Sequence, residues 1–206
     1  MIELFQKGGP MMWGLLAIFV LGLAFIIERF ITLLIKARLN PMKFMDQVTD
    51  AVDSGGVDAG RELCDATPQP VAKILGAGLA KVKLGREFVE EGIAAAGAVE
   101  LAFLDRGMLW IAMASTLGPI LGFLGTVTGM IKAFEAVASH GEVEPTIVAT
   151  GISEALITTA TGLLIAAPMV LFHTLFTSMI DRYSRDMEQA ASSLVDHLLE
   201  KGILKG

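Results

Sequence analysis

Cysteine is almost absent from this chain, since Cys64 is the only one among 206 residues. An intramolecular disulfide is therefore excluded, and cysteine ligands for a structural metal ion are lacking as well. The three histidines, His140, His173 and His197, are too scattered to indicate a metal site. The sequence also lacks a phosphate-binding glycine loop and a nucleophile elbow. We therefore expect no enzyme activity, no metal and no cofactor.

Charge is also scarce. Charged residues make up 18% of the chain and apolar residues 53%, whereas an ordinary soluble domain has about 25% charged residues. No Lys, Arg, Asp or Glu occurs in residues 107–131. The net charge of −6 is spread along the chain, and no basic cluster indicates binding of nucleic acid. This composition favours a protein embedded in a lipid bilayer.

Three apolar stretches are long enough to cross a bilayer, which takes about 20 residues. They lie within residues 1–35, 107–137 and 147–180. Residues 36–106 contain nine Lys or Arg and eleven Asp or Glu, so we expect a soluble helical domain there. The remaining divisions are a short link, 138–146, and a C-terminal helix, 181–206.

The cations set the orientation of these spans. Lys36, Arg38, Arg106, Arg182 and Arg185 all flank one side, while the link 138–146 carries no cation. The positive-inside rule puts these cations in the cytoplasm. We therefore predict an all-α membrane protein with three transmembrane helices, N-out and C-in, and long cytoplasmic helical extensions.

Local signals divide the soluble part into helices. Asn40 followed by Pro41 is a helix start, and the run 54–56, Ser-Gly-Gly, interrupts the helix that follows. Between residues 87 and 135 there is no turn cluster, so we expect one long helix that enters the membrane near Gly107. A last helix carries one apolar face, formed by Met187, Ala191, Leu194 and Leu198.

Small residues line one face of each of the last two spans. In the second span they are Gly118, Gly122, Gly125 and Gly129. In the third span they are Gly151, Ala155, Thr158 and Gly162. Small faces let membrane helices pack closely. We expect Leu at Gly122 or Gly125 to disrupt an oligomer by separating such contacts.

Polar residues inside the spans are the candidates for chemistry. Each threonine, among them Thr126, Thr158, Thr159 and Thr161, could satisfy its hydroxyl on its own helix. Alternatively, the clustered hydroxyls could hold water and help to relay a proton.

Ionisable groups are few in these spans. Glu154, the only carboxylate in 147–180, either caps the span at the interface or serves a pathway. Lys132 and Glu135 are three residues apart and could pair on a helix surface. No Asp occurs in any span, so a proton pathway would need a carboxylate from another chain.

Two motifs carry a resemblance to a known family. Residues 119–134 read PILGFLGTVTGMIKAF, and residues 151–163 read GISEALITTATGL, followed by Pro168. They resemble the second-span and third-span signatures of the MotA/TolQ/ExbB proton-channel family. Within this family, a chain with three spans resembles the TolQ/ExbB branch, because flagellar stator subunits usually have four spans.

This resemblance implies a pore-forming subunit of a proton-driven motor in the bacterial inner membrane. Such a multi-pass subunit forms a homo-oligomer, expected to be a pentamer, around a dimer of a single-span ExbD/TolR-like protein that supplies the proton-carrying Asp. A TonB/TolA-like protein is a further expected partner.

The resemblance also maps the family's ion pathway onto Thr126, Thr159 and Glu154. Thr158 and Thr161 add hydroxyls, which leaves the choice between H⁺ and Na⁺ open. Two alternatives stay open: an H⁺ or Na⁺ stator for motility, and a passive membrane scaffold.

Overall fold

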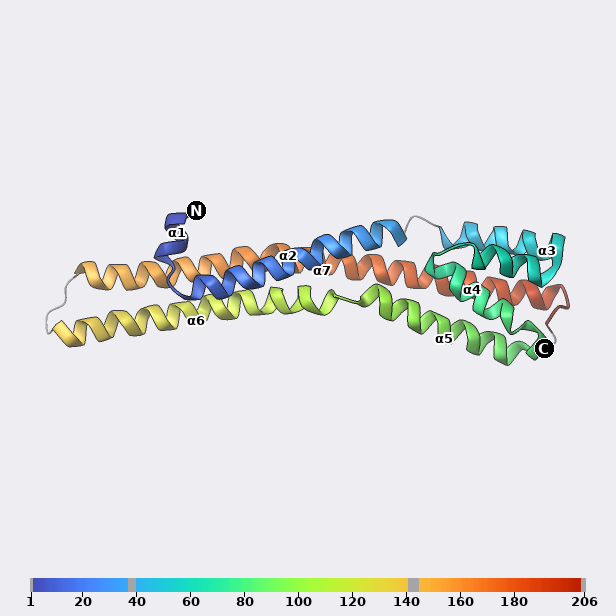
Figure 1. Cartoon of the computed structure of the whole chain (residues 1–206). Helices are drawn as coiled ribbons and strands as arrows, with labels where there is room; N and C mark the ends of the chain where they lie inside the picture. Colours follow the sequence, from blue (N-terminus) through green and yellow to red (C-terminus); the bar gives the residue numbers. More distant parts are fainter. Residues whose placement is uncertain (1, 37–39, 141–144, 205–206) are drawn as a thin grey trace. The chain divides into compact units, whose positions relative to one another are not determined.

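A computed structural model of the protein describes residues 2–36, 40–140 and 145–204, and this part contains helices but no strand. Contacts divide the chain into two units, the first formed by Met1–Arg29 and Gly107–Leu175 and the second by Phe30–Arg106 and Phe176–Gly206. The elements, drawn in Figure 1, are α1 (Ile2–Lys7), α2 (Met11–Lys36), α3 (Pro41–Asp65), α4 (Pro70–Ala80), the 3₁₀ turn η1 (Val82–Leu84), α5 (Arg86–Asp105), α6 (Met108–His140) and α7 (Pro145–Glu200).

Three helical stretches are long and apolar enough to cross a membrane, which confirms the predicted number of spans. They are Met11–Leu34, Arg86–Ser139 and Val148–Glu200. Large apolar side chains of the first unit are exposed in the single chain, and Leu164 is 76% exposed. Such a surface is unfavourable in water and suits contact with lipid or with other membrane helices.

The expected single helix over residues 87–135 is wrong, because the chain turns at Arg106 and Gly107. Helix α5 ends at Asp105, and Arg106 adopts an extended conformation, with φ −58° and ψ 126°. Gly107 follows with φ +90°, a conformation that L side chains rarely adopt, so this glycine separates α5 from α6.

The start of the second unit follows the sequence signals closely. Asn40 caps α3, because its side-chain oxygen accepts hydrogen bonds from the backbone N–H groups of Met42 and Lys43, at 3.1 and 3.4 Å. Gly56 interrupts α3 with φ +79°, at the expected break. Helix α4 ends at Ala80, and the 3₁₀ turn η1 follows it.

Helix α7 supplies much of the core of the second unit. Met187, Ala191, Leu194 and Leu198, the predicted apolar face, are all buried. Side chains of α3, α4 and α5 in the same unit, including Val48, Leu75 and Val89, are buried as well. Near its end, α7 is tied to α3 because His197 and Lys201 both contact the carboxylate of Asp53.

The expected division at 138–146 falls partly outside the described residues, which omit 141–144. The other divisions, 1–35, 36–106, 107–137, 147–180 and 181–206, stay predictions, as does the N-out orientation.

Candidate ion pathway

The small faces of α6 and α7 pack against each other within the first unit. A Cβ atom on Gly122 would lie 3.0 Å from the carbonyl oxygen of Thr158 and 3.1 Å from the Cα atom of Thr159. A Cβ atom on Gly118 would lie 3.0 Å from the carbonyl oxygen of Gly162. The two backbones therefore approach so closely that a Cβ atom at either position would require the facing backbone to shift by a few tenths of an ångström.

The rest of the two faces lies in the same contact. Gly129 lies against Gly151 and Ala155, and Gly125 lies against the side chain of Thr158. Gly122 and Gly125 therefore lie in a helix–helix contact, as expected, and this contact is within one chain. The effect of Leu at these positions on an oligomer stays a prediction. A larger residue there acts on the packing of α6 against α7 before it acts on any oligomer.

Thr159 joins the two helices by a hydrogen bond. Its hydroxyl donates to the carbonyl oxygen of Gly122 across the contact, at 3.0 Å. Thr126 lies four residues after Gly122 on α6, which is about one turn away. It donates to the carbonyl oxygen of Phe123 in its own helix, at 2.5 Å, and is half-buried. Both oxygens keep lone pairs that can accept a further hydrogen bond.

Thr158 and Thr161 have a different environment from that of Thr159. Thr158 is only 1% exposed, and its hydroxyl donates to the carbonyl oxygen of Ala155 in its own helix, at 2.8 Å. Thr161 donates to the carbonyl oxygen of Ile157, at 2.8 Å. The Thr158 side chain fills the space next to Gly125, which has no side chain. Thr158 therefore packs α7 against α6.

Glu154 forms an ion pair between the two helices. Its Oε1 atom accepts a hydrogen bond from Nζ of Lys132, at 2.7 Å. The Glu154 side chain is 20% exposed and that of Lys132 is 52% exposed. The pairing of Lys132 with Glu135 suggested by their spacing is wrong, because Lys132 reaches across to α7 instead.

The turn between α1 and α2 also contacts this carboxylate. Gly9, with φ +67°, lies directly beside the side chain of Glu154. Three elements therefore meet at Glu154. The spacing of residues in the sequence could not predict these contacts, because Gly9 and Lys132 are far from Glu154 along the chain.

Arg29 is a charged residue of the first unit whose burial sequence reasoning missed. It is 2% exposed, and its Nε atom donates to Oε2 of Glu28 at 2.6 Å. A charge within an otherwise apolar run could have indicated it, since such charges are costly to bury unless they are paired. Across the described residues, no group of three His, Cys, Asp or Glu side chains could hold a metal ion.

The model of the MotA/TolQ/ExbB proton channel family matches residues 66–189, which include α5, α6 and most of α7. The chain belongs to this family. The match covers both motifs and every proposed pathway residue.

Curated relatives agree with this membership. An ExbB-like protein of Synechocystis is 32% identical over 93% of this chain and 75% of its own length. The Tol-Pal system protein TolQ of Pseudomonas aeruginosa is 29% identical over 73% of this chain and 75% of its own length. The biopolymer transport protein ExbB of Salmonella typhimurium is 31% identical over 52% of this chain.

The chain spans only part of several relatives. It covers 42% of the length of the Salmonella protein and 64% of the length of an ExbB homolog from Methanothermobacter thermautotrophicus, to which it is 29% identical. What those whole proteins do therefore enters below as a proposal.

Proposed function

We propose that this chain is the pore-forming subunit of a proton-driven motor in the bacterial inner membrane, of the kind that serves TonB- or Tol-type energy transduction. The proposal rests on one observation, the close packing of α6 against α7. In this contact Thr159 lies beside Gly122, and Thr126 lies about one helical turn further along α6. The Glu154 carboxylate is on the same pair of helices.

The chemistry of this pair favours a pathway that another chain completes. A threonine hydroxyl can accept and donate a hydrogen bond but does not titrate at physiological pH. The spans 107–137 and 147–180 contain no Asp, and the Glu154 carboxylate is paired with Lys132. We therefore assign the group that cycles its proton to an Asp on a single-span ExbD/TolR-like partner, enclosed by a homo-oligomer of this chain.

Within this proposal the polar residues have distinct roles. The oxygens of Thr126 and Thr159 hydrogen-bond water or the proton carrier beside the partner's Asp. Glu154, held by Lys132, lies toward the outer mouth of the pathway, where its carboxylate oxygens can hydrogen-bond water. Thr158 packs α6 against α7 and takes no part in transfer.

The test is partner-dependent proton flux in vesicles, with assembly followed by native mass spectrometry. Thr126→Val and Thr159→Val keep the side-chain shape but remove the hydroxyl. We expect each to reduce flux at least about tenfold, the scale of one lost hydrogen bond to a charged group. Thr126→Ser and Thr159→Ser retain the hydroxyl and should restore most of the flux. Glu154→Gln should reduce it less.

Thr158→Val is the matched control, because it removes a neighbouring hydroxyl that is bonded to its own helix. We expect it to leave flux within about twofold of the wild type. Full flux in the Thr126→Val, Thr159→Val double variant would overturn the hydroxyl pathway and favour a scaffold. A loss of flux equally large in Thr158→Val would mean that packing, rather than hydrogen bonding, is being tested.

A further inference from the structure

A groove lies between α5 and α7 in the second unit. It encloses about 560 Å³. Apolar side chains of α4, α5 and α7 line it, among them Ile74, Ile93, Leu101, Met187 and Val195. Three small residues of α5, Ala94, Gly97 and Ala98, also line the groove.

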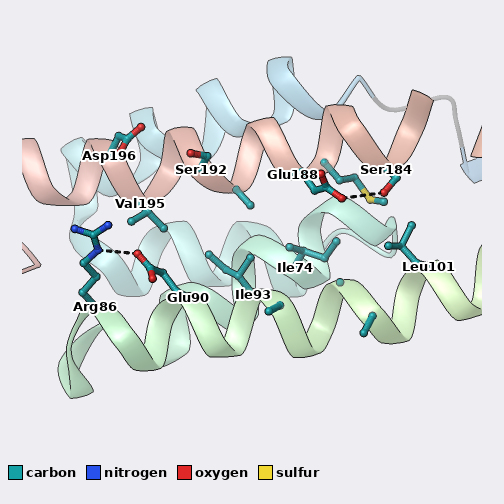
Figure 2. Close-up of a pocket in the computed structure, with 15 residues that line it drawn as sticks. Ile74, Arg86, Glu90, Ile93, Leu101, Ser184, Glu188, Ser192, Val195 and Asp196 are labelled. Atoms are coloured by element: carbon teal, nitrogen blue, oxygen red, sulfur yellow. Dashed lines mark hydrogen bonds and ion pairs between the residues drawn. The ribbon is translucent and has the colours of Figure 1, made fainter. Parts of the chain in front are cut away.

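The polar residues of the groove carry an excess of negative charge. Arg86 and Glu90 neutralise each other through an ion pair of 2.6 Å. Glu188 and Asp196 on α7 also line the groove, and neither forms an ion pair in the part of the chain that the structure describes. Glu188 accepts a hydrogen bond from Ser184 at 3.2 Å, and Asp196 interacts electrostatically with Arg86 at longer range. Figure 2 shows both side chains on α7 beside the apolar lining.

A second cavity continues the groove along the same two helices. It encloses about 280 Å³ and shares Leu101 and Ser184 with the first. Its charged residues are Asp105 and Asp181, both acidic. From Arg86 to Asp105 the combined groove follows α5 for about 29 Å, at about 1.5 Å per residue. This length matches about five turns of a docked helix.

We propose that the groove binds a basic amphipathic helix from a partner protein, with apolar side chains against the lining and Lys or Arg beside Glu188, Asp196, Asp105 and Asp181. A helix laid in an apolar groove is a common mode of recognition, and opposite charges at the rim select the partner. A second copy of this chain fits less well, because the chain has a net charge of −6 and the groove itself carries more acidic than basic side chains. The site is independent of the proposed ion pathway.

The experiment measures binding of a labelled synthetic peptide to the full-length protein in nanodiscs of phosphatidylcholine, by fluorescence anisotropy. The probe is a helical peptide of about 18 residues with Leu on one face and Lys on the other. A second peptide carries Glu in place of each Lys, and empty nanodiscs report binding to lipid. We expect the Lys peptide to bind the protein at least about tenfold more tightly than the Glu peptide, and less tightly as salt is raised.

Two pairs of variants locate the site. Glu188→Gln with Asp196→Asn should weaken binding of the Lys peptide about fivefold, whereas Glu87→Gln with Glu200→Gln, which removes two exposed charges outside the groove, should not. Ala94→Trp fills the groove and should abolish most binding, whereas Ala95→Trp, on the neighbouring position outside the lining, should not. The exposed charge variants keep the test valid if Ala94→Trp does not fold.

Three results would overturn the proposal. One is equal binding of the Lys and Glu peptides, and another is equal effects of the groove variants and their controls. The third is no peptide binding by the wild type together with a change of oligomeric mass in Ala94→Trp, which would assign the groove to a second copy.

Discussion

At the scale of single residues, neighbours of the same type have opposite environments. Thr158 and Thr159 follow each other on α7, yet the first is buried against Gly125 and the second donates across the contact to Gly122. Successive residues on a helix are about 100° apart, so one lies in the contact and the other at its edge. The proposed pathway uses the hydroxyl at the edge, that of Thr159.

The close approach at Gly122 leads to a prediction for stability. Gly122→Ala adds a Cβ atom 3.0 Å from the carbonyl oxygen of Thr158. This oxygen belongs to the backbone of α7, so it can move only if the helix moves. We expect the free energy of unfolding to fall by about 1–3 kcal/mol, the range for overpacking. Gly97→Ala on α5 is the control, since a Cβ there meets nothing within 4 Å. It should be neutral or stabilise by up to about 1 kcal/mol. Thermal unfolding of the solubilised protein measures both, and equal effects would contradict the close contact.

At the scale of elements, side-chain bridges join helices that are distant in sequence. Lys73 of α4 donates to Glu100 of α5 at 2.6 Å, and the Glu100 side chain is buried. At the end of α7, Lys201 donates to Oδ2 of Asp53 at 2.8 Å and the His197 ring lies 3.0 Å from Oδ1. These bridges connect α4 with α5 and α3 with α7.

The bridge at Asp53 predicts a pH dependence. The hydrogen bond from Lys201, together with that from His197, lowers the pKa of the Asp53 carboxyl below 3.8. A carboxyl whose pKa is lower in the folded state stabilises the fold above its unfolded pKa, about 3.9, and this contribution is lost as the pH falls through the folded value.

We therefore expect Asp53→Asn to lower the unfolding temperature at pH 7 and pH 5, with the difference from wild type disappearing toward pH 2. The effect should be small, because the bridge is exposed to solvent. Asp46→Asn is the control on the same helix, since Asp46 is exposed and forms no ion pair within the described ranges. A difference from wild type that stays constant from pH 7 to pH 2 would contradict the assignment.

At the scale of the whole molecule, the chain consists of a unit with a lipid-compatible surface and a unit with charged helices. The division falls at Arg29, Arg106 and Leu175, near the ends of the three predicted spans. The turn at Arg106 and Gly107 lies at this division. These positions agree with a membrane boundary there, which makes the orientation testable.

Cysteine labelling tests the orientation, and the structure decides which cysteines can report. Cys64 is buried, and burial raises the pKa of its thiol to about 12. The thiolate is the reactive form, so native Cys64 should stay unlabelled even in permeabilised cells. In a Cys64→Ala background, Gln47→Cys on the exposed face of α3 should react with a membrane-impermeant reagent only after permeabilisation. Ser139→Cys should react in intact cells, and the reverse pattern would overturn the N-out assignment.

Much of the architecture could be read from the sequence, because it depends on local and periodic signals. Apolar length predicts the three spans, and Asn40 with Pro41 predicts the start of α3. The spacing of Gly118, Gly122, Gly125 and Gly129 determines a small face, because residues three and four apart share one side of a helix. The family motifs are also contained in the sequence.

Only the tertiary structure decided what each face contacts. Periodicity places residues on one side of a helix but does not determine which neighbour covers that side. For this reason the sequence predicts helix packing at the glycine faces but not that α6 and α7 of one chain form it, and Lys132 pairs with Glu154 instead of Glu135. The break at Gly107 was also missed, because a single glycine inside an apolar run can either continue a helix or end it. The positive φ that distinguishes the two depends on the packing around Gly107, where the Phe25 ring lies 3.1 Å from the position of a Cβ atom.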